Sequence, residues 1–143
     1  LEGDLKVAPA FQFLLYPWVD ISGESDSIQR FGKGLILTEE TMTFFRDAYL
    51  PKQLESQAIK TSPILCEDMS KTPDTLMVTA EYDVLRDEGL AFVDKLQQAQ
   101  VSVTHLHLPD CTHGFISTGK FSPATRKRLN EVAAMLDTYA ASI

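Results

Sequence analysis

Several features are scarce in this 143-residue chain, and each scarcity excludes a class of protein. Two cysteines, Cys66 and Cys111, are too few for a disulfide framework or a four-cysteine zinc site. The sequence shows no signal peptide, and no apolar run approaches the ~20 residues that cross a bilayer. We therefore expect a protein without a membrane span, in a reducing, cytoplasmic setting.

Positive charge is also in short supply. The chain has 13 lysines and arginines against 20 aspartates and glutamates, a formal net charge of −7. The acidic residues are dispersed along the chain, which argues against a disordered acidic tail. An acidic protein repels the phosphate backbone, so nucleic acid is not an expected partner.

What is present is enough for one packed domain. With 143 residues, 44% of them hydrophobic, the chain can bury one core and is too short for two ordinary domains. The chain starts at Leu1 and reaches an apolar run at Phe11. We therefore expect a piece of a longer protein, although a removed or missing start is an open alternative.

The first half of the chain predicts one strand and then a loop. Residues 11–16 form a short apolar, aromatic run that ends at Pro17, which is typical of a strand. Residues 20–34 are rich in serine, glycine and charge without periodicity, so they are predicted to form a loop.

A helix is predicted next, within an excursion from the sheet that spans residues 20–74. Thr38 is a suitable N-cap, and the helix should end before Pro51. Its apolar face carries Met42, Phe45 and Tyr49, with Phe44 and Ala48 alongside. Residues 52–74 are expected to be a loop with one helical turn at most.

The second half, residues 75–143, predicts a βαβ unit followed by a helix. The strands are expected at 76–80 and 101–108, the crossover helix at 87–100, and the closing helix from the N-cap Ser122. Strands joined by a crossover helix run parallel, so the sequence favours an α/β fold with a mostly parallel sheet flanked by helices.

Asp83 and His113 are the candidate catalytic residues. Each follows a predicted strand, and open parallel sheets form their binding crevices at the carboxyl ends of strands. Histidine titrates near neutral pH and can act as a general base, with a carboxylate to orient it. The alternative is structural, in which Asp83 caps the following helix and His113 is an ordinary loop residue.

The residues around these two positions resemble a known family. Ala80-Glu81-Tyr82-Asp83-Val84-Leu85-Arg86-Asp87-Glu88-Gly89 and His113-Gly114-Phe115 are similar to the C-terminal half of the hormone-sensitive-lipase-like branch of the α/β-hydrolases. Leu15-Tyr16-Pro17, Gly34-Leu35-Ile36-Leu37-Thr38 and Ser62-Pro63-Ile64-Leu65 resemble further segments of that family. The resemblance implies carboxylic ester hydrolysis, with Asp83 as the acid, His113 as the base and no cofactor.

The nucleophile of that family is missing. Its oxyanion motif, His-Gly-Gly-Gly, and its nucleophile elbow, Gly-x-Ser-x-Gly, both lie upstream of the matched region, and neither occurs here. Gly23-Glu24-Ser25-Asp26-Ser27 lacks the strand-to-helix setting that an elbow needs, and Cys66 lacks the flanking glycines. The chain is therefore expected to be inactive alone, with the upstream half of the hydrolase domain as its partner and 20–74 as part of a lid.

Two rival functions are kept open. A metal-assisted hydrolase would use His105, His107 and His113, because His105 and His107 point to the same face of a strand. A non-catalytic half-domain would associate through its open sheet edges, 11–16 and 101–108. The edge at 101–108 also predicts a homodimer, a mode that the family resemblance implies.

Overall fold

The computed structural model describes residues 9–50, 60–119 and 121–141. Its elements, in chain order, are β1 (Phe11–Leu15), α1 (Asp26–Phe31), α2 (Glu39–Tyr49), a 3₁₀ turn η1 (Pro63–Leu65), β2 (Asp74–Tyr82), α3 (Arg86–Gln98), β3 (Val103–Thr112), α4 (Phe115–Thr118) and α5 (Pro123–Ala140).

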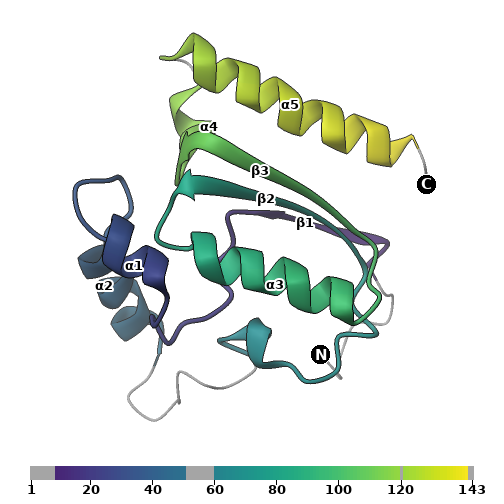
Figure 1. The fold of residues 1–143 in the computed structure, drawn as a ribbon, viewed down its shortest axis with the longest axis horizontal. Helices are drawn as coiled ribbons and strands as arrows, with labels where there is room; N and C mark the ends of the chain where they lie inside the picture. The colour runs from purple at the N-terminus through teal and green to yellow at the C-terminus, as the bar shows by residue number, and fades with distance from the viewer. Residues whose placement is uncertain (1–8, 51–59, 120, 142–143) are drawn as a thin grey trace.

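The three strands form one parallel sheet in the order β1-β2-β3 (Figure 1). β1 pairs with the first half of β2, from Phe11 opposite Asp74 to Leu15 opposite Val78. Helix α3 covers one face of the sheet and α5 the other, as Figure 1 shows. The predicted βαβ unit with parallel strands is confirmed.

β2 is the central strand because its side chains are apolar on both faces. Met77 packs against Phe92 and Leu96 of α3. Val78, the next residue along, points to the other face and belongs to the cluster that contains Val132 of α5. A continuous apolar run is what a parallel strand needs when helices cover both of its faces.

The predicted boundaries differ from the structure at several places. β2 begins before the predicted 76–80 strand and ends after it, and β3 continues past Leu108 to Thr112. The prediction of a loop over residues 20–34 is wrong, because α1 occupies Asp26–Phe31. A six-residue helix is too short to show periodicity, and its buried residues, Ser27 and Ile28, contact parts of the chain far away in sequence.

Helices α1 and α2 lie beyond the carboxyl ends of the strands, at the left of Figure 1. Thr38 caps α2 as predicted, since its side chain accepts a hydrogen bond from the Thr41 N–H. Met42 is the one residue of α2 that is buried, whereas Phe44 and Tyr49 are 67% and 71% exposed. The predicted apolar face of this helix is therefore largely uncovered in the described part of the chain.

Within the described residues, no helix has both the length and the apolar character needed to cross a membrane.

Candidate active site

Strand register places Asp83 beside His113. The last pair between β2 and β3 is Tyr82 opposite Thr112, so the next residue of each strand comes to the same edge of the sheet. His113 Nδ1 lies 2.8 Å from Asp83 Oδ2, which is a hydrogen bond between the imidazole and the carboxylate. The predicted contact between these two side chains is present.

The pairing depends on an irregularity in β3. The chain advances two residues in β2, from Ala80 to Tyr82, while it advances four in β3, from Leu108 to Thr112. Pro109 falls in this stretch, and proline has no N–H to donate to a strand partner. The extra length carries the chain around to Thr112, and Gly114 then turns it with a φ of +72°, a conformation that favours glycine.

The carboxylate of Asp83 has two roles in the structure. Its side chain is 1% exposed, while that of His113 is 24% exposed. Oδ2 bonds His113, and Oδ1 accepts the Leu85 N–H at 2.9 Å, just before α3 begins. One side chain therefore bonds both the backbone that leads into α3 and the imidazole, so the two predicted roles of Asp83 do not exclude each other. The bond to the backbone fixes the carboxylate in the orientation that meets the imidazole.

An aromatic side chain covers the imidazole. The ring centroid of Tyr16 lies 4.4 Å from that of His113. Phe115 packs edge-on against Tyr16, with the two ring centroids 5.7 Å apart. Tyr16 has a φ of +36°, which is unfavourable for a bulky residue before proline. Burial, and then the charge of Asp83, raise the pKa of the Tyr16 hydroxyl. Backbone strain of this kind concentrates at functional sites.

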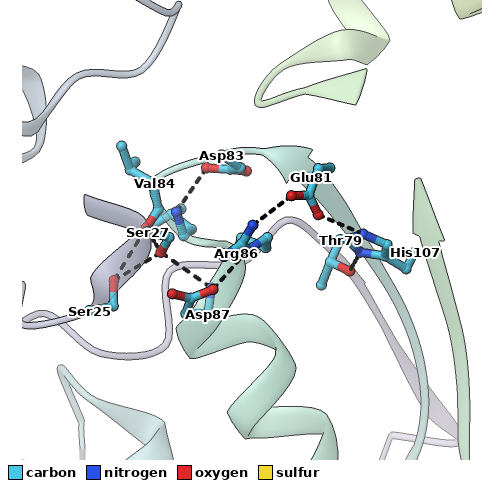
Figure 2. Close-up of polar contacts among 10 residues, drawn as sticks. Ser25, Ser27, Thr79, Glu81, Asp83, Val84, Arg86, Asp87 and His107 are labelled. Atoms are coloured by element: carbon cyan, nitrogen blue, oxygen red, sulfur yellow. Dashed lines mark hydrogen bonds and ion pairs between the residues drawn. The ribbon is translucent and has the colours of Figure 1, made fainter. Parts of the chain in front are cut away.

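The turn that carries Asp83 is braced by charged side chains (Figure 2). Arg86 makes two ion pairs, to Glu81 at 2.6 Å and to Asp87 at 2.7 Å. Glu81 in turn meets His107 Nε2 at 3.2 Å, which links the turn to β3. Both residues that flank the Asp83 turn are thus held by one guanidinium.

The predicted metal alternative is not favoured by this geometry. His105 Nε2 and His107 Nδ1 each lie 2.9 Å from the hydroxyl of Thr79, so the two rings share a protein partner. His113 instead bonds Asp83. Among the residues that the structure describes, no three His, Cys, Asp or Glu side chains are grouped so as to hold a metal ion. His105 and His107 do share a face of β3, but His113 does not join them.

The two weak nucleophile candidates occupy structural positions. Ser25 precedes α1, and its hydroxyl lies 3.0 Å from that of Ser27. Cys66 follows η1, and its sulfur donates to the Asp68 carbonyl at 3.2 Å. Cys111 is buried near His113 in sequence, and burial raises the pKa of its thiol to about 11, which disfavours a reactive thiolate.

Sequence reasoning missed Glu88, which is buried next to the site. Its Oε1 accepts the N–H groups of Val19 and Asp20 at 2.7 and 2.9 Å, where the chain leaves β1 for the excursion. Burial raises the pKa of Glu88 to about 8, against the opposing effect of these two hydrogen bonds. The spacing of residues could have revealed the burial of Glu88, because it precedes Phe92 and Leu96 at intervals of four and so shares their face of α3.

A cavity of about 430 Å³ lies between the segment after β1, helix α2 and the segment before η1. Its lining includes Trp18, Ile21, Phe45, Tyr49, Thr61 and Pro63. Phe44, the neighbour of Phe45 in α2, is not among the lining residues. Trp18, which lines the cavity, lies two residues after Tyr16, which contacts the imidazole of His113. A short segment of chain therefore connects the imidazole with the cavity.

The chemistry available to this arrangement is proton transfer. A carboxylate acceptor on Nδ1 holds the imidazole in the tautomer whose Nε2 can accept a proton. Such a pair can deprotonate a hydroxyl and later return the proton to a leaving group, while the carboxylate stabilises the imidazolium between these steps.

Comparison with known proteins agrees with this geometry. A family model described as an alpha/beta hydrolase fold matches residues 2–117. The chain is 35% identical over 112 residues to an ethyl acetate hydrolase of Pseudomonas putida, covering 78% of this chain and 35% of that protein. It is 30% identical over 132 residues to the carboxylic ester hydrolase LipN of Mycobacterium tuberculosis, covering 92% and 35%.

A solved structure is similar over nearly the whole chain. The crystal structure of a mutant of LAE6, an alpha/beta hydrolase enzyme from the metagenome of Lake Arreo, superposes with a TM-score of 0.86 at 37% identity. The match covers 93% of this chain and 42% of that one. The chain thus spans well under half the length of the relatives that it matches.

Proposed function

Because this chain belongs to the alpha/beta-hydrolase fold family, we propose that it supplies the acid and the base of a carboxylesterase or lipase. The resemblance to the hormone-sensitive-lipase-like branch is confirmed, as is the fold class, a parallel sheet flanked by helices. The observation that carries the proposal is the 2.8 Å bond between the buried Asp83 and the more exposed His113.

In the proposed mechanism, His113 moves the proton and Asp83 orients His113. Nε2 takes the proton from a serine hydroxyl as its oxygen attacks the acyl carbon of the ester. The same nitrogen then gives the proton to the departing alcohol, and a water molecule repeats the cycle to release the acid. Asp83 accepts the Nδ1–H throughout and stabilises the imidazolium without becoming protonated.

We propose that an upstream segment provides the nucleophilic serine and the oxyanion hole. β1 supports this proposal. It is the outer strand of the described sheet, yet it carries apolar side chains on both faces, Phe13 on one and Leu14 on the other, and both are only partly buried. A strand that is apolar on both faces is typical of a sheet interior. In this proposal the 143 residues are the C-terminal portion of one hydrolase domain, and they lack esterase activity alone.

The cavity beneath α2 is the proposed pocket for part of the ester substrate, with residues 20–74 as the lid. Its lining is mostly apolar or aromatic, as a binding site for an acyl chain or an alcohol group requires. Phe45 lines it and Phe44 does not, which provides a matched pair. Phe45→Ala should raise KM severalfold for an ester that fills the pocket, whereas Phe44→Ala should leave KM unchanged.

The test of the proposal is turnover of short acyl esters in a protein that joins this chain to the preceding segment. Asp83→Asn and His113→Ala should each lower kcat by about three to four orders of magnitude, because both proton transfer and orientation are lost. Ser22→Ala, a change at a partly exposed loop position, is the control. Turnover close to that of the unchanged protein in either of the first two variants would refute the assignment.

We also propose that two copies can associate through the outer edge of β3. In the described sheet this strand has β2 on one side only, and an uncovered strand edge is a template for pairing. Sedimentation equilibrium would show a dimer, and a proline placed at an outward-facing N–H of β3 should shift it to monomer. A protein that stays monomeric at high concentration would exclude this mode.

A cytoplasmic location is the remaining part of the proposal. Both cysteines are free, and Cys111 is buried, as is usual for thiols in a reducing compartment. Fractionation of the source cells tests it, and recovery from an oxidising compartment would contradict it.

A further inference from the structure

The serine-containing segment that failed as a nucleophile elbow has a different place in the structure. Ser27 is completely buried in the first turn of α1, a helix of the excursion. Its hydroxyl donates to the Val84 carbonyl at 2.6 Å and accepts the Asp87 N–H at 3.3 Å (Figure 2). These two groups belong to the residue after Asp83 and to the first turn of α3.

One hydroxyl therefore spans the turn that holds the acid. The N–H groups of a helix's first turn have no partner within the helix, and α3 has no side-chain cap from its own N-cap residue, Leu85. Asp83 satisfies the Leu85 N–H, and Ser27 satisfies that of Asp87 from a distant part of the chain. Ser27 completes the N-terminus of α3 from outside the helix.

Apolar packing links the same two parts of the molecule. Ile28 and Met42 of the excursion form one buried cluster with Val84 and Leu85 of the acid turn. The hydrogen bonds of Ser27 lie beside this cluster. They fix the orientation of α1 relative to the Asp83 turn, because a hydrogen bond is directional and apolar contacts are not. A shift of α1 would thus be transmitted to the backbone on which Asp83 is mounted.

On this basis we propose that Ser27 is a positioning residue that couples the lid to the catalytic acid. The inference rests on the proposed function, since it gives Asp83 its catalytic role. Removing the hydroxyl takes the Ser27 partner away from a buried carbonyl and from a partly buried N–H. The turn then relaxes, and the carboxylate no longer meets His113 in the geometry that proton transfer needs.

The test compares Ser27→Ala, Ser27→Cys and Ser25→Ala in the protein that joins this chain to the preceding segment. Ser25 is a control on the same segment: its hydroxyl lies 3.0 Å from that of Ser27 and 3.4 Å from the Val84 carbonyl, but it makes no bond to the Asp87 N–H. Its removal leaves the two bonds of Ser27 to the turn in place. Ser27→Ala should lower kcat about tenfold with KM within about twofold. Ser27→Cys, which fills the space with a poor hydrogen-bonding group, should be similarly impaired, and Ser25→Ala should change neither constant by more than about twofold.

A second readout is independent of hydrolysis. In NMR spectra of the folded protein, the His113 Nδ1–H and the Leu85 amide should exchange with water faster in Ser27→Ala than in Ser25→Ala. Normal kcat and unchanged exchange in Ser27→Ala would overturn the coupling, as would full recovery by Ser27→Cys. If Asp83→Asn retains turnover, the proposed function fails instead, and the exchange rates still decide whether Ser27 positions the turn.

Discussion

The unit that carries Asp83 and His113 and the excursion over residues 20–74 are built in opposite ways. In β2, side chains such as Met77 and Val78 are completely buried between two layers of helices. In α2, most apolar side chains face outward, and Phe44, Phe45 and Tyr49 are all more than half exposed. The sheet with its two covering helices is a fully packed core, called the finished core below. Helix α2 presents an apolar surface that the described residues do not cover.

The two regions suit different tasks: the packed sheet holds side chains in fixed positions, and the exposed helix offers a surface for binding. Asp83 and His113 follow the ends of adjacent strands whose register fixes their distance, as the proposed proton transfer requires. In the described part of the excursion, Asp20 bonds Glu88 of α3 and Ser27 bonds the Val84 carbonyl. The aromatic side chains of α2 stay largely exposed. Exposed apolar groups of this size often mark an interaction or ligand-binding surface.

The largest expected effect on stability comes from the finished core. Met77→Ala removes a fully buried side chain that contacts α3, and the cavity left behind should lower the free energy of unfolding by about 2–5 kcal/mol. Urea denaturation followed by circular dichroism measures this loss. A change below about 1 kcal/mol would mean that the sheet is not the stable part of the molecule.

Glu88 connects the two regions, and its titration should make that connection pH-dependent. Its pKa is raised by burial to about 8, so the favourable contribution of the neutral form is complete below pH 4.5 and is lost as the pH rises through 8. From pH 5 to 8 the loss should be on the order of 3 kcal/mol.

Glu88→Gln is the matched variant for this titration. Its amide oxygen can still accept the N–H groups of Val19 and Asp20, but the side chain does not ionise. Melting temperatures measured across this range should fall less steeply in Glu88→Gln than in the unchanged protein. Parallel curves would show that Glu88 does not ionise within this range.

The smallest effect should come from the uncovered helix. Phe44→Ala removes an aromatic ring that is 67% exposed, and its cost to the free energy of unfolding should stay below about 0.5 kcal/mol. The same denaturation assay applies. A loss comparable to that of Met77→Ala would show that α2 is part of the core, which would erase the contrast between the regions.

The sequence predicted the finished core better than the excursion, for a physical reason. An apolar run between two helices is visible locally, and parallel register then brings Asp83 and His113 to the same edge of the sheet. The roles of Ser27 and Glu88 depend on contacts 57 and 69 residues away along the chain. No local pattern encodes such contacts, although the spacing of Glu88 with Phe92 and Leu96 was a usable signal.

Tyr16 illustrates the same limit at the site itself. The apolar run through residue 16 predicted a strand, yet the strand ends at Leu15 and Tyr16 adopts a positive φ. The dipeptide Tyr16-Pro17 favours an extended conformation at Tyr16, so local preference gives the wrong answer here. The observed conformation sets the ring against His113, which is a tertiary contact.

The central claim is that Asp83 and His113 activate a serine that lies outside these 143 residues. The direct measurement is mass-spectrometric mapping of a fluorophosphonate label, which reacts with activated serines, on the protein that joins this chain to the preceding segment. We predict a single labelled serine in the preceding segment, and loss of the label in His113→Ala. Labelling of Ser25, Ser27 or Ser62, or labelling that survives His113→Ala, would contradict the account.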